Sequence, residues 1–133
     1  MRYILVYGTL RRNALNNWNY QRFGPHLFIE NITLPNYAMF ALSHYPTVCP
    51  SDNPGDKIVC ELQEVENNVY NMIEAMEHGA GYEKVSVDIN TISKNNITAS
   101  LFVWPQDRIK KYGLKKIESG DWAAPISPQS QLL

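Results

Sequence analysis

Cysteine is scarce in this sequence, whose 133 residues include only Cys49 and Cys60. The two cysteines form no C-x-x-C pair, and neither stands at metal-ligand spacing from a histidine. The three histidines, His26, His44 and His78, are also far apart in the sequence. We therefore expect reduced thiols, no disulfide framework and no metal site.

Long apolar runs and an excess of one charge are absent as well. No apolar segment approaches the ~20 residues that a membrane-spanning helix needs, and the start of the chain lacks the pattern of a signal peptide. Twelve Lys and Arg oppose thirteen Asp and Glu, for a net charge of −1. The one basic cluster, at 110, 111, 115 and 116, is typical of a solvated surface. These absences predict a cytoplasmic protein that binds neither membrane nor nucleic acid.

The composition that remains is that of a folded domain. Hydrophobic residues make up 44% of the chain and charged residues 19%, which are globular values. The length suits one domain over residues 1–133 with a sizeable core. After Trp122, Pro125 and Pro128 stand among small polar residues, so we expect about 123–133 to form a weakly ordered tail.

Most ordered elements are expected to be strands. Val85, Val87 and Ile89 alternate with polar residues, which is typical of a half-buried strand. Residues 12–19 fit either a loop or a short irregular helix. With one clear helix besides, the pattern predicts an α+β fold in which a helix packs on a curved sheet or partly closed barrel. The expected strands lie at about 3–7, 27–34, 37–42, 58–65, 82–89 and 97–104.

The clear helix is predicted at about 67–78. Asn67 or Asn68 can cap its start, and Gly79 is placed to end it. Its apolar stripe follows the spacing i, i+3, i+4, i+7 and consists of Val69, Met72, Ile73 and Met76.

Glu77 stands out on this helix because of its position. It lies about 80° from Val69 around the helix axis, at the border of the buried face. It also falls in the last turn, where the helix dipole disfavours a carboxylate. Burial and the dipole both raise a carboxyl pKa, so Glu77 is a candidate general base. The alternative interpretation is a boundary glutamate paired with a lysine such as Lys84.

A second candidate feature is the end of the first strand. Tyr3 to Tyr7 lacks polar alternation, which predicts a strand buried on both faces. Gly8 is expected to end it, since glycine accepts backbone angles that other residues avoid. The following turn can offer backbone N–H groups to an anion. It can equally be an ordinary strand and turn.

Three aromatic residues are candidates for a pocket wall or for sheet packing: Tyr45, Tyr82 and Trp104. Both interpretations remain open from the sequence.

Taken together, these segments resemble the γ-glutamylcyclotransferase-like family, which includes γ-glutamylamine cyclotransferases and AIG2-like proteins. The resemblance runs from Tyr3 to Trp122. This chain departs from the family pattern at Cys60, where glycine is usual, at Phe102 or Trp104, where tyrosine is usual, and at 83–84. The matching segments are Y-G-T-L-R at 7–11, Y-P at 45–46, I-V-C-E-L at 58–62, I-E-A-M-E-H-G at 73–79 and S-G-D-W at 119–122.

The resemblance implies a small mixed β-barrel-like sheet with one main helix and short flanking helices. It implies an enzyme that needs no cofactor or metal and releases 5-oxoproline and an amine from a small γ-glutamyl substrate. Alternatives are a non-catalytic AIG2-like module that binds a small ligand, and removal of a γ-glutamyl protecting group from a larger conjugate. Arg11 and Arg12 receive no role, and the amine and the oligomeric state are left open. By resemblance the catalytic residue is Glu77, and the substrate-binding residues are Tyr7, Gly8, Thr9, Leu10, Tyr45 and Tyr82.

Overall fold

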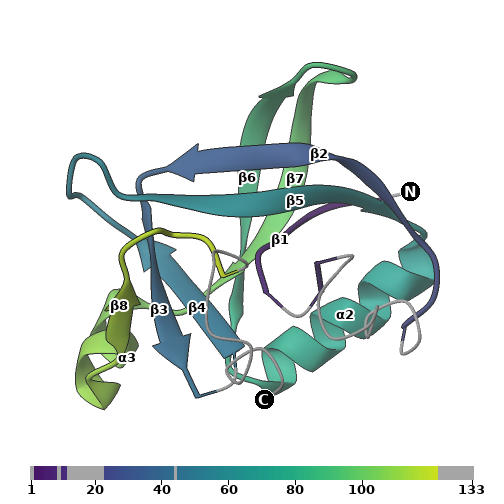
Figure 1. Ribbon diagram of the computed structural model, residues 1–133. Helices are drawn as coiled ribbons and strands as arrows, with labels where there is room; N and C mark the ends of the chain where they lie inside the picture. Colours follow the sequence, from purple (N-terminus) through teal and green to yellow (C-terminus); the bar gives the residue numbers. More distant parts are fainter. Residues whose placement is uncertain (1, 9, 12–22, 44, 123–133) are drawn as a thin grey trace, which may run out of the picture.

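The computed structural model describes residues 2–8, 10–11, 23–43 and 45–122, and this part of the chain forms two β-sheets and two helices (Figure 1). The first sheet contains, in spatial order, β2 (His26–Pro35), β5 (Lys57–Val65), β1 (Arg2–Val6), β7 (Asn95–Val103) and β6 (Glu83–Thr91). The second contains β4 (Tyr45–Pro50), β3 (Tyr37–Leu42) and β8 (Lys115–Ile117). The helices are α2 (Asn67–Gly79) and α3 (Gln106–Tyr112).

Strand β1 is the centre of the first sheet. It pairs antiparallel with β5 and parallel with β7, so both of its faces are covered. Ile4 and Val6 belong to one buried cluster, whereas Leu5 and Tyr7 belong to the other. The expectation of a strand buried on both faces is confirmed.

Backbone hydrogen bonds join the two sheets. Trp104, which follows β7, donates its N–H to the carbonyl of Val48 in β4 at 2.9 Å. In Figure 1 the second sheet lies at the lower left, below one end of β2 and β5, and α2 lies at the lower right. The sheets together curl into a half-barrel, which confirms the predicted α+β, barrel-like fold.

Helix α2 occurs where it was predicted, but its buried face and its caps differ. Tyr70 is buried together with Val69 and Ile73, whereas Met72 is 43% exposed. The predicted stripe was therefore wrong at Met72. The N-cap is Glu66, without a side-chain hydrogen bond, instead of Asn67 or Asn68. The helix includes Gly79, and Ala80 is its C-cap.

The strands β4 and β8 were not predicted, and the short flanking helices that the resemblance implies were given no position, so α3 was not located. Prolines at both ends of β4 obscured it, but β4 is an edge strand, where proline is tolerated. Helix α3 has seven residues and buries only Ile109, so it gives no apolar stripe to detect. Among the helices that the structure describes, none has the length and apolar character needed to cross a membrane. The interpretation of 12–19, the tail at 123–133 and the residues Thr9 and His44 fall outside the described residues.

Candidate active site

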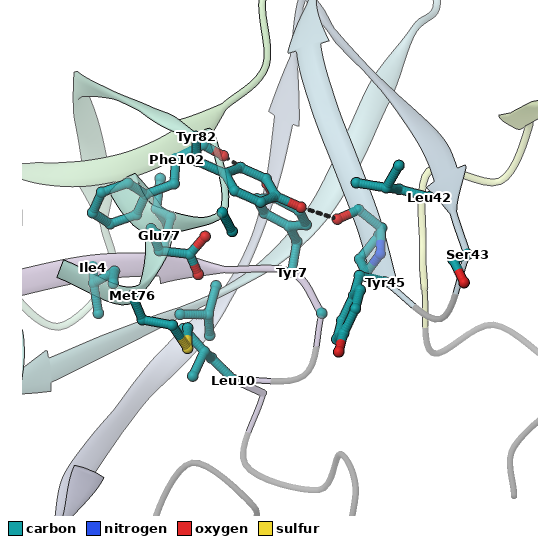
Figure 2. A pocket seen from close by; sticks show the side chains of 15 residues that line it. Ile4, Tyr7, Leu10, Leu42, Ser43, Tyr45, Met76, Glu77, Tyr82 and Phe102 are labelled. Atoms are coloured by element: carbon teal, nitrogen blue, oxygen red, sulfur yellow. Dashed lines mark hydrogen bonds between the residues drawn. The ribbon is translucent and has the colours of Figure 1, made fainter. Parts of the chain in front are cut away.

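A pocket of about 560 Å³ opens where β1 ends, beside the C-terminal end of α2 and the β3–β4 turn (Figure 2). Its size is in the range of small-ligand sites in proteins. Every predicted site residue in the described part of the chain contributes to its wall; Thr9 lies outside that part. The lining residues are Ile4, Leu5, Val6, Tyr7, Gly8, Leu10, Leu42, Ser43, Tyr45, Pro46, Met76, Glu77, Ala80, Tyr82 and Phe102.

Glu77 is the only charged side chain among the described residues that line this pocket. Its carboxylate points into the pocket toward Tyr7 (Figure 2). Burial raises its pKa from 4.5 to about 7. Lys84 instead pairs with Glu74, at 2.7 Å between Nζ and Oε2. No hydrogen bond or ion pair joins the Glu77 carboxylate to any described residue, so the predicted alternative, a pair with Lys84, is wrong.

The inward direction of Glu77 follows from the rotation of α2 about its axis. Tyr70, Ile73 and Glu77 stand at i, i+3 and i+7 and share one face of the helix. The Tyr70 hydroxyl lies 2.9 Å from the Ser100 hydroxyl in β7, which fixes this face against the sheet. Glu77 is therefore closer to the centre of the buried face than a stripe centred on Val69 implies.

Two buried tyrosines, Tyr7 and Tyr82, contribute polar groups to the pocket wall. Tyr7 donates its hydroxyl to the carbonyl of Phe102 at 2.6 Å, and Tyr82 donates its hydroxyl to the carbonyl of Pro46 at 2.9 Å. Burial raises the pKa of Tyr82 to about 12 and the pKa of Tyr7 well above its ordinary value. Both side chains are therefore neutral phenols whose protons are held by the backbone. Their oxygens keep the capacity to accept a hydrogen bond.

Gly8 is required by a close contact and not by its backbone angles. A Cβ at this position would lie 2.6 Å from Cγ and 2.8 Å from Cδ of Pro46. Gly8 is not among the described residues with positive φ, so the predicted need for unusual backbone angles is wrong. The Arg11 N–H donates to the Gly8 carbonyl at 3.0 Å and closes a turn from Gly8 to Arg11. The Y-P segment at 45–46 and the glycine thus fit against each other.

The aromatic candidates divide between the pocket and the core. Tyr45 lies at the pocket wall and is half exposed, at 54% of the whole residue. Trp104 is buried, packs beside Tyr82 with ring centroids 6.1 Å apart, and does not line the pocket. Sheet packing is therefore the better interpretation for Trp104.

Several lining residues were not predicted: Leu42, Ser43, Met76, Ala80 and Phe102. Met76 was assigned to the core, and Phe102 was noted only as a departure from the family. Ser43 has a φ of 54°, in the β3–β4 turn that forms one wall. No periodicity marks a turn as a pocket wall, so Ser43 carries no local sequence signal.

Thiol chemistry and a metal centre find no support in the described residues. Cys49 and Cys60 are free and buried, and neither lines the pocket. Burial raises the pKa of the Cys60 thiol to about 12, which disfavours a nucleophilic thiolate. Within the ranges that the structure describes, no three His, Cys, Asp or Glu side chains gather as metal ligands.

Comparison with known proteins identifies relatives of this chain in sequence and in fold. The family model "Gamma-glutamyl cyclotransferase, AIG2-like" matches residues 4–124. The γ-glutamylcyclotransferase family protein YtfP of Escherichia coli is 30% identical over 125 residues, which cover 90% of this chain and 94% of YtfP. The solution structure of E. coli YtfP has a TM-score of 0.62 at 27% identity, over 92% of this chain and 96% of that one. An AIG2-like protein from Mus musculus shares the fold, with a TM-score of 0.72 at 19% identity over 94% and 91%.

Proposed function

Because the chain belongs to the gamma-glutamyl cyclotransferase, AIG2-like family, we propose that it is a cyclotransferase. It converts a γ-glutamyl amine or γ-glutamyl amino acid into 5-oxoproline and a free amine. The observation that carries this proposal is the Glu77 carboxylate, which faces the pocket without a described partner and has a pKa of about 7. A base with a pKa near the working pH transfers protons effectively.

The reaction rearranges one substrate molecule and consumes no water. Glu77 takes a proton from the α-ammonium group, and the freed α-amine attacks the γ-carbonyl carbon. A new C–N bond closes the five-membered ring as the amide bond to the leaving amine breaks. Glu77 returns this proton to the departing nitrogen, then takes the second proton from the ring nitrogen and passes it on, so that the amine leaves as an ammonium ion. Atoms and charges balance without a co-reactant.

The remaining pocket groups hold the two ends of the glutamyl unit. The turn from Gly8 to Arg11 offers backbone N–H groups to the carboxylate or to the carbonyl oxygen, whose negative charge grows during attack. The hydroxyl oxygens of Tyr7 and Tyr82, whose protons are given to backbone carbonyls, can accept from the α-ammonium. Clamping both ends brings amine and carbonyl together, and this proximity is a large part of the rate enhancement.

The walls beside Glu77 favour an uncharged group next to the scissile amide. Met76 and Phe102 lie on either side of Glu77 and give this part of the pocket an apolar surface (Figure 2). We therefore expect γ-glutamyl derivatives of amines with an aliphatic stem, such as γ-glutamyl-ε-lysine, to react better than derivatives with a charge next to the amide.

The test is an assay for 5-oxoproline with a panel of γ-glutamyl amines and γ-glutamyl amino acids. We expect turnover by the wild-type protein and by Glu74→Gln, but not by Glu77→Gln. Glu74 is the matched control because it lies on the same helix and pairs with Lys84 outside the pocket. Equal activity of Glu77→Gln and wild type would show that the proposed base is wrong. Thermal stabilisation by 5-oxoproline without turnover of any substrate would instead support the non-catalytic binding module.

A further inference from the structure

A polar cluster lies behind the turn that follows β1 and joins segments far apart in the sequence. Arg11 directs its guanidinium at two carboxylates: Nε lies 3.4 Å from Oε2 of Glu61 in β5, and Nη1 lies 2.8 Å from Oδ1 of Asp121. Gln63 donates Nε2 to Oε1 of Glu61 at 3.2 Å. We call these four residues the anchor cluster.

The anchor cluster is bonded directly to the backbone of the turn. The same Nε2 of Gln63 donates to the Leu10 carbonyl at 3.1 Å. That carbonyl is thereby directed at β5, and Leu10 is also a lining residue of the pocket. The hydrogen bond that closes the turn uses the Arg11 N–H. Leu10 is thus held through its carbonyl and Arg11 through its side chain.

The burial of this cluster makes its geometry specific. Glu61 is 3% exposed and Gln63 is 1% exposed, so each needs polar partners in the positions they occupy. Asp121 is held in position by its neighbour Gly120, which is bonded to β5. Gly120 accepts the Val59 N–H at 2.8 Å, and any Cβ on Gly120 would lie 1.9 Å from a β5 carbonyl. The S-G-D-W segment is therefore fastened to β5 at the place where its aspartate reaches Arg11.

We propose that the anchor cluster positions the backbone of Gly8, Leu10 and Arg11 for substrate binding. This inference rests on the proposed cyclotransferase function of the same pocket. The four residues touch no substrate; they fix the direction of the Leu10 carbonyl and the position of Arg11. A shift of about 1 Å in such a group can cost about 100-fold in rate. This assigns one shared role to Arg11 and to the segments at 58–62 and 119–122, none of which takes part in the proton transfer.

The test compares Glu61→Gln and Asp121→Asn with a control ion pair. Lys116→Met is the control, since Lys116 and Asp56 form a partly buried pair at 2.7 Å whose residues do not line the pocket. We expect kcat/KM to fall about 10- to 100-fold in Glu61→Gln and about 3- to 10-fold in Asp121→Asn, and to stay within about 2-fold in the control. Asp121 is 29% exposed, so its variant is expected to fold even where Glu61→Gln does not.

Two further readouts separate positioning from general damage. The pH dependence of kcat/KM should keep its inflection in both anchor variants, because Glu77 is untouched. Amide hydrogen exchange at Gly8 and Leu10 should accelerate at least about 10-fold in the anchor variants and not in the control. If the protein turns over no substrate, the proposed function has failed. Hydrogen exchange at Gly8 and Leu10 then still tests the anchor cluster separately. Kinetics equal to those of the control, with or without faster exchange, overturn the inference.

Discussion

Replacing Glu77 by glutamine should stabilise the protein while it removes activity. Burial raises the pKa of Glu77 from 4.5 to about 7, so the folded protein holds this proton more tightly than the unfolded chain. Below about pH 4.5 the group is protonated in both states and contributes no difference. Between about pH 4.5 and 7 the unfolded chain binds fewer protons, and stability therefore falls as the pH rises. Above pH 7 the full cost of the buried charge remains.

The size of this cost follows from the pKa change. A rise from 4.5 to about 7 corresponds to about 3 kcal/mol of lost stability for the ionised protein. Small domains are stable by about 5–15 kcal/mol, so the effect is a large share of the total. For a chain of this length it corresponds to roughly 10 °C in Tm. Glutamine has nearly the shape of glutamate and carries no charge, so Glu77→Gln should recover most of this free energy above pH 7.

Urea unfolding at about pH 5 and pH 8 measures the effect. The variant should exceed wild type by about 3 kcal/mol at the higher pH and by much less at the lower. Glu74→Gln is the control: Lys84 lowers the pKa of Glu74, so its removal should destabilise the protein above that pKa, with the opposite sign. A Glu77→Gln variant that is less stable than wild type at pH 8, or a difference independent of pH, would refute the assignment of a desolvated, unpaired carboxylate.

Three other changes test the site. The kcat/KM of the wild type should rise with pH through an inflection near 7, as Glu77 becomes a carboxylate able to accept the proton; a flat profile from about pH 5 to 9 contradicts its role as the base. Gly8→Ala should cost about 1–3 kcal/mol in urea unfolding and reduce activity, because its Cβ meets Pro46 at 2.6 Å. Gly79→Ala, with no atom within 4 Å of the new Cβ, should be neutral or stabilising, and equal losses in both variants would reject the contact argument. Tyr82→Phe should cost about 1 kcal/mol by leaving the Pro46 carbonyl without its donor and should raise KM; an unchanged KM would remove Tyr82 from substrate binding.

Elements with a strong local pattern could be predicted from the sequence. The strand Tyr37–Leu42 occurs with the predicted bounds, and the alternation of Val85, Val87 and Ile89 matches their greater burial relative to their neighbours in β6. The apolar run before Gly8 became the central strand, as its lack of alternation indicated. These cases succeed because burial is encoded in the spacing of neighbouring residues.

Elements whose stability comes from distant partners could not be predicted in this way. Strand β4 pairs with β3 despite the prolines at 46 and 50, because only one of its edges needs backbone donors. On α2, Tyr70 took the buried position expected for Met72. Its hydroxyl meets a serine thirty residues away, which the helical period does not reveal.

The sequence by itself determined the fold class, the central strand, the main helix and the candidacy of Glu77, because each depends on local spacing and on the helix end. The tertiary structure decided that Glu77 faces the pocket, that Lys84 pairs with Glu74 instead, and that Gly8 is needed for its contact with Pro46. It also decided the role open to Arg11, whose carboxylate partners lie fifty and 110 residues further along the chain. Local patterns set which surfaces are buried, whereas the partner of a buried charge depends on how the strands are ordered in space.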